Sequence, residues 1–516
     1  MAVAAGSQES TRVLIVGAGP VGLGMAIGLR RLGIDPVVVE RHPSTLGFPK
    51  GRLVSVRTME ILREWGIDRD LEAAALPREE SLFIFSGASL LADTFERTGQ
   101  GAQALAASPT QRLLCDQMVM EEVLLDHARA LDVDLRFSTN LLSFTQGPES
   151  VIAELTDDSG RRFSLEAEWM VGADGARSDT RTALGFERSG SGRHGSAVSI
   201  YFRAPLGERM SGRTAGRYDL ASIPGASVLV VDNDRRWLII RPYDPEVESP
   251  DRFTHDWAHD LARRAIGDPG IPVEIVGIKF WETSTLVADS YRDRRVLLAG
   301  DAAHVVTPIG GLGMNCGIAD VHNLAWKLAG VIEGWATPNL IDTYETERRP
   351  VAIATAEASK GPARPPATAH GIVLGYSYNS AGIVPDGTPE RIFADPVNDY
   401  VASARPGNRA PHYWLDEAQT SSTVDLFGKR FTVLTDKLGE PLVTAAIAHP
   451  SLLGQVPVRV VALDGQSWND QYGVKAGGAV VVRPDGHVSS RHFDRRSTEA
   501  ELIESLRQAT GHPPVP

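Results

Sequence analysis

The sequence predicts an α/β protein that begins with a doubly wound parallel sheet, continues into an antiparallel sheet and ends in a separate α/β unit. A glycine-rich turn at residues 17–22 joins a β-branched run to a helical pattern. Strand-like runs separated by short turns follow between residues 198 and 241. A second strand-and-helix pattern occupies about residues 405–516, so the 516 residues correspond to roughly three domains.

The composition is that of an ordinary globular protein. Hydrophobic residues make up 42% of the chain and charged residues 23%, which is typical of a packed protein rather than a disordered one. Lys and Arg number 52 against 65 Asp and Glu, and the resulting net charge of −13 argues against non-specific nucleic-acid binding. A local basic pocket for an acidic small molecule remains compatible with that total.

Cysteine content and hydropathy indicate where the protein works. Cys115 and Cys316 cannot form a CxxC pair, a disulfide framework or a cysteine zinc site, and we read both as small buried thiols. Residues 1–12 lack the pattern of a signal peptide, and no apolar run approaches the ~20 residues needed to cross a bilayer. We therefore expect a cytoplasmic protein with no metal, no membrane and no nucleic-acid partner.

The first 40 residues have the pattern strand, turn, helix, strand. Residues 12–16 and 36–40 are the strands, and a helix runs from the turn to Arg31. Within the turn, Gly17 permits a tight bend, Gly19 lets backbone approach a pyrophosphate, and Gly22 allows close packing of helix on strand. The partial positive charge of the helix N-terminus favours that anion.

An acidic residue completes this dinucleotide-binding pattern. Glu40 ends the second strand, where its carboxylate can accept hydrogen bonds from both ribose hydroxyls of an adenine nucleotide. Arg41 either lines the adenosine site or is a solvated surface arginine. The order of these features predicts dinucleotide binding but does not choose between NAD and FAD.

Further elements follow at regular intervals. Helical spacing marks residues 57–65, 117–131 and 320–333; strand-like runs mark 151–170 (a hairpin), 198–241 and 295–299; Pro, Gly and Ala mark linkers at 361–366 and 397–411.

Several motifs along residues 12–350 carry a specific resemblance. In chain order they are Pro49-Lys50-Gly51-Arg52 with Arg57-Thr58-Met59-Glu60, Gln117-x-x-x-Glu121, Gly172-Ala173-Asp174-Gly175-Ala176-Arg177-Ser178-x-x-Arg181, Gly300-Asp301-Ala302-Ala303-His304 with Pro308-x-Gly310-Gly311-x-Gly313-Met314-Asn315, and Asp342-x-Tyr344-Glu345-x-Glu347-Arg348-Arg349-Pro350. Together with the glycine turn they resemble the group A flavoprotein monooxygenases, the para-hydroxybenzoate hydroxylase-like family. Lys50 stands where that family usually carries arginine.

The resemblance implies a Rossmann-like FAD-binding fold interleaved with an antiparallel-sheet substrate domain. It assigns FAD as the cofactor and NADPH or NADH as the electron donor. The residues that it places at the cofactor are Gly17, Gly19, Pro20, Gly22, Glu40, Arg41, Gln117, Asp174, Asp301, Pro308, Gly311, Gly313, Met314 and Asn315.

Each assignment has a physical reading and, for some residues, an alternative. Asp301, just after a strand, can bind flavin ribitol hydroxyls; otherwise it caps a helix. Gln117 lies beside the flavin or is a solvated helix residue. Pro308 rigidifies a loop whose glycines bring backbone N–H groups together, before a helix expected from Asn315, around the negative charge of a reduced flavin. His304 is read as structural.

The implied reaction is aromatic hydroxylation. Reduced nicotinamide donates hydride to FAD, the flavin reacts with O2 to give a C4a-hydroperoxide, and its distal oxygen attacks an electron-rich phenolic ring. The protein orients both partners and excludes water, and no catalytic side chain is assigned. The substrate-lining candidates are Arg217, Tyr218, Arg241 and Trp281, each of which has a surface or core alternative.

The C-terminal part carries a resemblance of its own. Residues 406–412 (PGNRAPH) resemble the start of the thioredoxin-like domain of phenol and aromatic-polyketide hydroxylases, and Leu374-Gly375-Tyr376 with Tyr378 and Ser380 resembles a segment of the polyketide branch. Without CxxC this domain cannot exchange dithiols. We expect an FAD-binding domain at 1–82, 111–190 and 291–350, a substrate-binding domain at 83–110 and 191–290, a helical or linker segment at 351–404, and the thioredoxin-like domain at 405–516.

Three functional hypotheses follow. The first is hydroxylation of a polycyclic polyketide-type aromatic; the second is a simple-phenol hydroxylase, an epoxidase or a Baeyer–Villiger enzyme of the same flavoprotein family. The third is a non-catalytic flavoprotein that acts as a binding module, against which the intact flavin loop argues. A flavin halogenase is disfavoured because Trp237-Leu238-Ile239 does not match the WxWxIP-type motif. The exact substrate and the oligomeric state, including a homo-oligomer, stay open.

Overall fold

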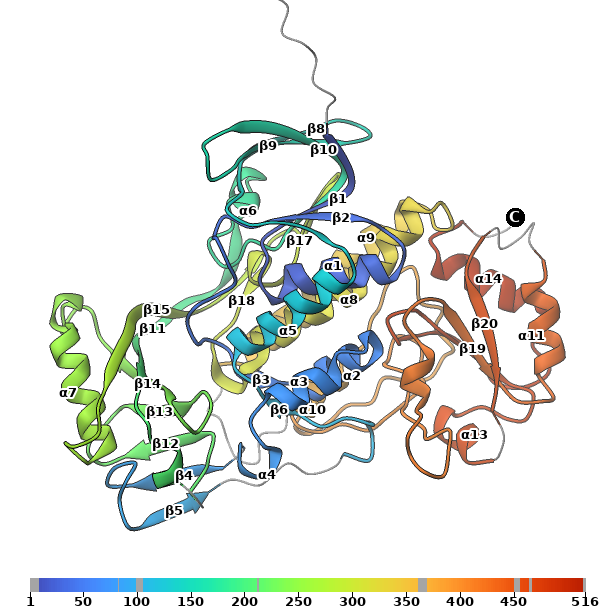
Figure 1. Cartoon of the computed structure of the whole chain (residues 1–516). Coiled ribbons are helices and arrows are strands. Elements are labelled where there is room, and N and C mark those ends of the chain that lie inside the picture. The colour runs from blue at the N-terminus through green and yellow to red at the C-terminus, as the bar shows by residue number, and fades with distance from the viewer. Residues whose placement is uncertain are drawn as a thin grey trace, which may run out of the picture.

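The computed structural model describes residues 9–81, 83–98, 105–210, 213–360, 369–449, 455–463 and 466–513. These residues form three adjoining bodies (Figure 1): a central α/β body, a sheet covered by one helix on one side of it, and a C-terminal α/β body on the other. The predicted fold class is therefore confirmed. The linker expected at 361–366 lies outside the described residues.

The central body is built on a mostly parallel sheet. Its strand β1 (Glu9–Val16) pairs in parallel with β2 (Pro36–Val39) and with β10 (Arg162–Gly172), as the opening pattern predicts. The remaining strands of this sheet are β7 (Asp134–Arg136), β8 (Asn140–Gln146), β9 (Val151–Thr156), β16 (Arg292–Asp293) and β17 (Val296–Leu298). The carboxyl ends of β1, β10 and β17 meet at one edge, which is where an open α/β sheet binds ligands.

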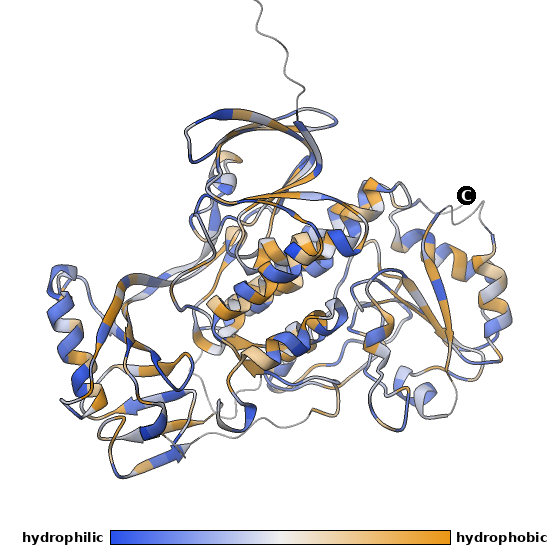
Figure 2. Ribbon diagram, viewed as in Figure 1, coloured by the Kyte–Doolittle hydropathy of each residue, from blue (hydrophilic) through white to orange (hydrophobic). Residues whose placement is uncertain are grey.

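Helices cover this sheet and carry most of the central core. They are α1 (Pro20–Arg31), α2 (Val56–Trp65), α3 (Asp68–Ala74), α4 (Arg78–Ser81), α5 (Gln117–Ala130), α6 (Asp179–Ala183), α8 (Leu312–Ile332), α9 (Asn339–Ala358) and α10 (His370–Leu374), with the short strands β3 (Leu53–Val54) and β6 (Leu113–Leu114) pairing beside them. Figure 2 shows hydrophobic residues concentrated in α1 and α8, which pack side by side. Among the described helices, none combines the length and apolarity of a membrane-spanning segment.

The second sheet is antiparallel except where β12 (Arg217–Leu220) runs parallel to β4 (Ile84–Gly87). Its other strands are β5 (Phe95–Thr98), β11 (Arg188–Arg203), β13 (Ser227–Val230), β14 (Arg236–Tyr243), β15 (Glu274–Ala288) and β18 (His304–Val305). Helix α7 (His255–Ile266) packs its buried side on one face of this sheet, with Trp237 and Ile239 beneath it. The opposite face is turned toward the central body, because Phe48 packs on Tyr201 with ring centroids 5.8 Å apart.

The C-terminal body has the sheet order β20 (Val458–Ala462), β19 (Phe431–Thr435), β21 (Ala479–Val482), β22 (Val488–His492). The β19/β20 pair is parallel and the other two pairs are antiparallel. Helices α11 (Glu440–Ile447) and α14 (Glu499–Ala509) pack on it, and α13 (Gln466–Tyr472) lies beside it. The body shares its core with the central one, since Trp326 of α8 meets the Phe431 ring edge-on at 5.6 Å.

Buried ion pairs join the C-terminal body to the central body. Glu347 of α9 accepts hydrogen bonds from Arg483 at 2.6 and 2.8 Å and from Lys327 at 2.7 Å, and all three side chains are buried. Burial alone would raise the pKa of Glu347, but Arg483 and Lys327 lower it far below its ordinary value. A second pair joins Arg409 to Glu60 of α2, with Nε 2.8 Å from Oε2. These ion pairs hold the C-terminal body on the central body, because separating them would leave buried charges without partners.

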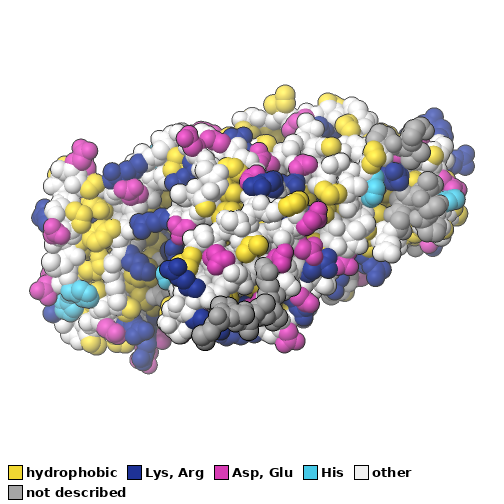
Figure 3. All heavy atoms as spheres, turned by 90° about the horizontal axis from the view of Figure 1, so that it is seen from above, with side chains coloured by type: hydrophobic (Ala, Val, Ile, Leu, Met, Phe, Trp, Pro, Cys, Tyr) yellow, Lys and Arg dark blue, Asp and Glu magenta, His cyan; other side chains and the backbone are white. Residues whose placement is uncertain are grey.

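The surface agrees with the charge balance of the sequence. Figure 3 shows acidic and basic side chains intermingled over the upper face, with no extended tract of one sign. The net charge of −13 is thus not offset by a continuous basic surface on this face.

Candidate functional site

The glycine turn is closely packed at Gly17 and Gly22 and open at Gly19. Gly17 has a φ of +108°, and a Cβ there would lie 2.4 Å from the carbonyl oxygen of Ala173. A Cβ on Gly22 would lie 1.9 Å from the carbonyl oxygen of Gly17. A Cβ on Gly19 would meet no protein atom within 4 Å. Gly17 and Gly22 are therefore required for the backbone path, whereas the space beside Gly19 suits a bound group.

Two helices present their N-termini to the same region without a side-chain cap. Gly19 is the N-cap residue of α1, and neither a capping side chain nor an acidic residue in the first turn neutralises its N–H groups. Gly311 is the N-cap of α8, which also lacks both. Both ends are positively polarised and suit the diphosphate of FAD and the negative charge of its reduced ring.

Glu40 holds the turn as well as facing the expected ribose. Its Oε2 accepts from the backbone N–H of Ala18 at 2.9 Å, and its Oε1 accepts from that of His42 at 2.9 Å. Each carboxylate oxygen keeps further acceptor capacity for a ribose hydroxyl. Arg41 is exposed and lies 3.6 Å from Asp179, which is compatible with its surface reading.

The loop after Pro308 differs from the prediction in one respect. Gly310 and Gly311 have φ values of 77° and 63°, as a glycine loop requires, but α8 begins at Leu312 rather than at Asn315. Gly313 and Met314 therefore lie in the first turn of the helix. Propensity favoured a later start, because glycine is a poor helix former, and tertiary packing overrides it.

Asn315 is used by the protein itself. Its Oδ1 accepts from the backbone N–H of Ser55 at 2.8 Å and from the Thr58 hydroxyl at 2.7 Å, and its Nδ2 donates to the Leu53 carbonyl at 2.8 Å. The side chain ties α8 to β3 and α2. Any contact from this residue to the cofactor would come from its backbone.

Two carboxylates, Asp301 and Asp174, follow strands of the central sheet at its ligand-binding edge. Asp301 is reached by solvent yet surrounded by protein on its other sides, and this desolvation raises the pKa of its carboxyl despite His304 and Lys50 nearby. Asp174 accepts from the backbone N–H of Thr180 at 2.9 Å through Oδ2, while its buried Oδ1 has no protein partner. An acceptor left over in this way fits a ligand donor.

Gln117 supports the segment that carries Lys50. Its Oε1 accepts from the backbone N–H of Gly51 at 3.3 Å, and its Nε2 donates to Glu121 at 2.8 Å. Glu121 in turn accepts from the backbone N–H of Leu46 at 2.8 Å. The first residue of α5 therefore positions residues 46–51 against the second sheet.

Strand pairing decides which candidates can face the flavin. Paired residues point to the same face of a sheet, and neighbours alternate. Tyr201 of β11 pairs with Leu238. Ala197 is four residues before Tyr201, so it lies on the same face, and it pairs with Trp281. Arg217 pairs with Leu229, which itself pairs with Leu238. Arg217 and Trp281 therefore share the face that turns toward the central body.

The other two residues predicted to line the substrate, Tyr218 and Arg241, lie on the opposite face, so the prediction is wrong for both. Tyr218 is fully buried among Phe85 and Phe95, and its hydroxyl donates to the Arg213 carbonyl. Arg241 forms a two-pronged ion pair with Glu248 on the α7 side, at 2.9 and 3.0 Å. Strand β14 has apolar residues at successive positions, so its sequence alone could not assign the direction of Arg241. Strand β12 alternates Arg217 and Asp219 with Tyr218 and Leu220, a pattern that is typical of a buried Tyr218.

The face toward the central body holds residues that the sequence analysis did not select. Trp281 donates from Nε1 to the Ser199 hydroxyl at 2.9 Å, and Lys279 lies over the Phe48 ring, its Nζ 4.6 Å from the centroid. The partly exposed apolar side chains of this face are Leu229 and Ile240. Because side chains alternate between the two faces of a strand, these residues could have been selected from the sequence if one residue on the face toward the central body had been known.

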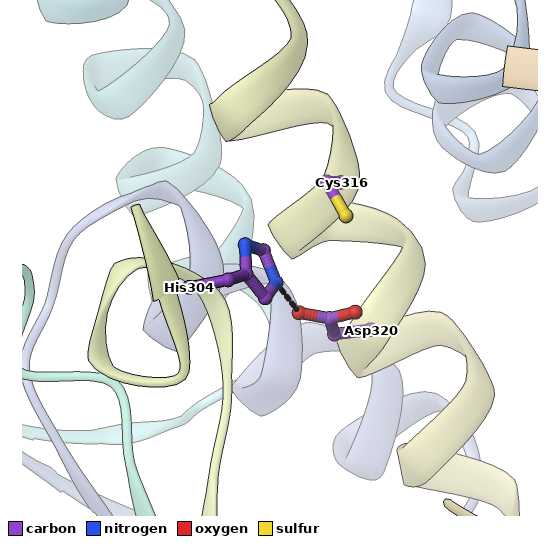
Figure 4. A group of neighbouring side chains, drawn as sticks. All are labelled: His304, Cys316 and Asp320. Carbon is purple, nitrogen blue, oxygen red and sulfur yellow. Dashed lines mark hydrogen bonds and ion pairs between the residues drawn. The ribbon is translucent and has the colours of Figure 1, made fainter. Parts of the chain in front are cut away.

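His304 and the cysteines occupy buried structural positions. Figure 4 shows His304 of β18 pointing toward Asp320 of α8, with Cys316 one turn before it. Their ligand atoms lie within 4.8 Å of one another, but Arg348 also donates to Asp320 and to Cys316, at 2.8 and 3.5 Å. A fixed guanidinium there disfavours a metal cation. Elsewhere, burial raises the pKa of the Cys115 thiol to about 12, as expected of an unreactive core thiol.

Comparison with known families agrees with this site. Residues 10–359 match the FAD binding domain family, and residues 403–513 match the aromatic-ring hydroxylase C-terminal family. The chain belongs to the FAD-binding aromatic-ring hydroxylases, and it is an FAD-dependent aromatic monooxygenase.

Individual relatives cover nearly the whole chain. It is 35% identical to tetracenomycin A2 monooxygenase-dioxygenase of Streptomyces glaucescens, over 94% of both chains. It is 31% identical to 2,4-dichlorophenol 6-monooxygenase of Delftia acidovorans, over 93% of this chain and 94% of that one. Its structure resembles aklavinone-11 hydroxylase in a complex with FAD and aklavinone, with a TM-score of 0.85, 32% identity, and coverage of 98% of this chain and 100% of that one.

Proposed function

We propose that this enzyme hydroxylates a polycyclic phenolic substrate of the aromatic-polyketide type, with NADH or NADPH as electron donor and O2 as co-substrate. The observation that carries the proposal is the face of the second sheet toward the central body. It presents the partly exposed side chains of Leu229, Ile240 and Trp281 toward the central body, together with Arg217 and Lys279. A flat, fused-ring substrate buries more area on such a surface than a single ring does. The tetracenomycin and aklavinone enzymes among the relatives support the same class.

The chain's own residues bind and orient both partners. Glu40, the α1 N-terminus and Asp301 would hold the ribose, the diphosphate and the ribitol of FAD, and the α8 N-terminus would face the flavin ring. Bound FAD, reduced by the nicotinamide, supplies the activation of O2 for transfer of one oxygen atom to the ring. The sheet face holds the substrate against that position and excludes water.

Lys279 lies on the sheet face toward the central body, above the Phe48 ring, and Lys50 is in its neighbourhood. Burial and, to a smaller extent, the charge of Lys50 lower the pKa of Lys279. Lys50 also acts on Asp301. A phenolate between these cations would be stabilised, and a phenolate ring is more electron-rich than a phenol. We propose this electrostatic role for Lys50 in place of the arginine usual in the family.

The test is substrate-stimulated oxidation of NADH and NADPH by the FAD-loaded protein, with product masses measured. The panel holds hydroxylated tricyclic and tetracyclic quinones beside single-ring phenols and 2,4-dichlorophenol. The proposal expects stimulation and a product gaining one oxygen with the fused-ring compounds. Stimulation by single-ring phenols alone would establish the simple-phenol alternative, and no stimulation by any compound would favour a non-catalytic flavoprotein.

A further inference from the structure

The carboxylate of Asp320 fixes the backbone from which Asp301 projects. Its Oδ2 accepts from the backbone N–H of Gly300 at 3.1 Å and from His304 Nε2 at 2.6 Å. Gly300 has a φ of +62°, and a Cβ there would lie 2.8 Å from the Val21 side chain of α1. The turn is therefore constrained by its packing on α1, and Asp320 holds the residue that directly precedes Asp301.

This carboxylate is charged and fully buried. Burial alone would raise the pKa of Asp320, but His304 and Arg348 lower it. Burial alone would lower the pKa of His304, but Cys316 and Asp320 raise it well above its ordinary value. Arg348 donates from Nε to Asp320 Oδ1 at 2.8 Å. A buried carboxylate with three donors has no freedom to move without leaving a charge unpaired.

Arg348 carries the connection to the C-terminal body. Its Nη2 donates to the Cys316 carbonyl at 3.1 Å, and its Nη1 donates to the Tyr378 hydroxyl at 3.2 Å. The backbone N–H of Tyr378 donates to the Gly407 carbonyl at 2.8 Å, and its ring stacks on His487 with centroids 4.2 Å apart. A continuous buried path therefore runs from the Asp301 turn to the C-terminal body.

We propose that Asp320 is a positioning residue for the FAD site, and that the C-terminal body sets its position through Tyr378 and Arg348. This gives the C-terminal body, which has no CxxC pair, a role in holding the cofactor. The proposal rests on FAD binding at this site and is independent of the substrate class. A wild-type protein that binds FAD but hydroxylates nothing would end the proposed function and leave this proposal standing.

The experiment compares three conservative variants of the full chain. Asp320→Asn keeps the shape but loses the charge. Tyr378→Phe keeps the stack on His487 and loses only the acceptor for Arg348. The matched control is Tyr472→Phe, which removes the hydroxyl of another fully buried tyrosine, one that donates to the Pro411 carbonyl at 2.6 Å within the C-terminal body. For each, the Kd of FAD is measured by quenching of flavin fluorescence, the visible circular dichroism of bound flavin is recorded, and the Tm of the apoprotein is determined.

The expected results separate positioning from general stability. Asp320→Asn raises the Kd of FAD about tenfold and Tyr378→Phe about threefold, the scale of one charge-assisted and one weaker hydrogen bond. Both change the circular dichroism of the bound flavin. Tyr472→Phe lowers the Tm and leaves the Kd and the spectrum unchanged. If Asp320→Asn does not fold, the proposal is tested by comparing the Kd of FAD and the flavin circular dichroism of Tyr378→Phe with those of Tyr472→Phe. A Kd and a spectrum in Tyr378→Phe that match those of the control would overturn the proposal.

Discussion

Replacing Gly19 by alanine separates cofactor binding from folding. The backbone of Gly19 is extended, with φ −75° and ψ −176°, which alanine adopts freely. A Cβ there meets no protein atom within 4 Å. The apoprotein should therefore be as stable as the wild type or more stable by about 0.4–1 kcal/mol, because alanine reduces the entropy of the unfolded chain.

The methyl group nevertheless fills space that the diphosphate needs at the N-terminus of α1. We expect the Kd of FAD to rise at least about tenfold, equivalent to ~1.4 kcal/mol. Gly22→Ala is the contrasting variant, since its Cβ would lie 1.9 Å from the Gly17 carbonyl oxygen. That variant should lose about 1–3 kcal/mol of apoprotein stability or more, because the helix must move away from the strand.

The assay has two parts on the same preparations. Apoprotein is titrated with FAD while flavin fluorescence is followed, and urea unfolding of the apoprotein gives the free energy of unfolding. Gly19→Ala with wild-type FAD affinity would refute the assignment of the diphosphate to this turn. Loss of stability in Gly19→Ala would show that the open space is filled by the protein in solution.

Three further predictions concern single side chains. Glu347→Gln leaves Arg483 and Lys327 buried with a weaker partner and should cost about 3–5 kcal/mol at pH 7 in urea unfolding. The pKa of Glu347 is lowered in the folded state, so its contribution to the free energy of unfolding is present above about pH 4.3 and is lost as the pH falls further. The difference in unfolding free energy between wild type and Glu347→Gln should therefore become smaller in acid. A difference that stays constant with pH would contradict this. Asp301→Ala should raise the Kd of FAD about tenfold by equilibrium dialysis, and unchanged affinity would remove its ribitol role. Trp281→Phe loses the bond to Ser199 and should raise the KM for a fused-ring substrate up to about tenfold with the Kd of FAD unchanged; the reverse pattern would place it at the cofactor.

Local signals in the sequence account for the parts of the fold that were predicted correctly. Gly22 is crowded by the carbonyl of Gly17 within the same turn, which is a local constraint, whereas the crowding of Gly17 comes from Ala173 after the neighbouring strand. The strand-and-helix pattern predicted for about residues 405–516 agrees with β19, β20 and β21, because β-branched runs there are separated by turn residues. The local constraint at Gly22 and these strand patterns need no tertiary information.

The direction of side chains in the second sheet needed tertiary information. α7 covers one face and the central body covers the other, so apolar residues occur at successive positions and Trp237, Leu238 and Ile239 are all buried. Only the pairing with β11 shows that Leu238 shares the face of Tyr201, toward the central body, and that Arg241 does not. The start of α8 was missed for a related reason, since packing, not propensity, makes residues 312–315 helical.

The sequence motif at residues 342–350 contains Glu347 and Arg348, but the partners that make them a buried charge network could not be predicted from the sequence. Asp320, Arg348 and Tyr378 lie on separate segments, and each alone resembles a surface helix residue or a core tyrosine. Charged residues are rarely buried unless they are paired, so only the partners reveal their position. The same holds for the contact between Glu347 and Arg483, which joins the central body to the C-terminal one.

The central claim is that this site transfers an oxygen atom from O2 to a fused-ring phenol. The most direct measurement supplies isotopically labelled O2 to the FAD-loaded enzyme with NADPH or NADH and the hydroxylated tetracyclic quinone that stimulates it most. The account predicts a product carrying one labelled oxygen atom from O2. A product whose new oxygen comes from water, or nicotinamide oxidation that yields hydrogen peroxide and no oxygenated product with any member of the panel, would contradict it.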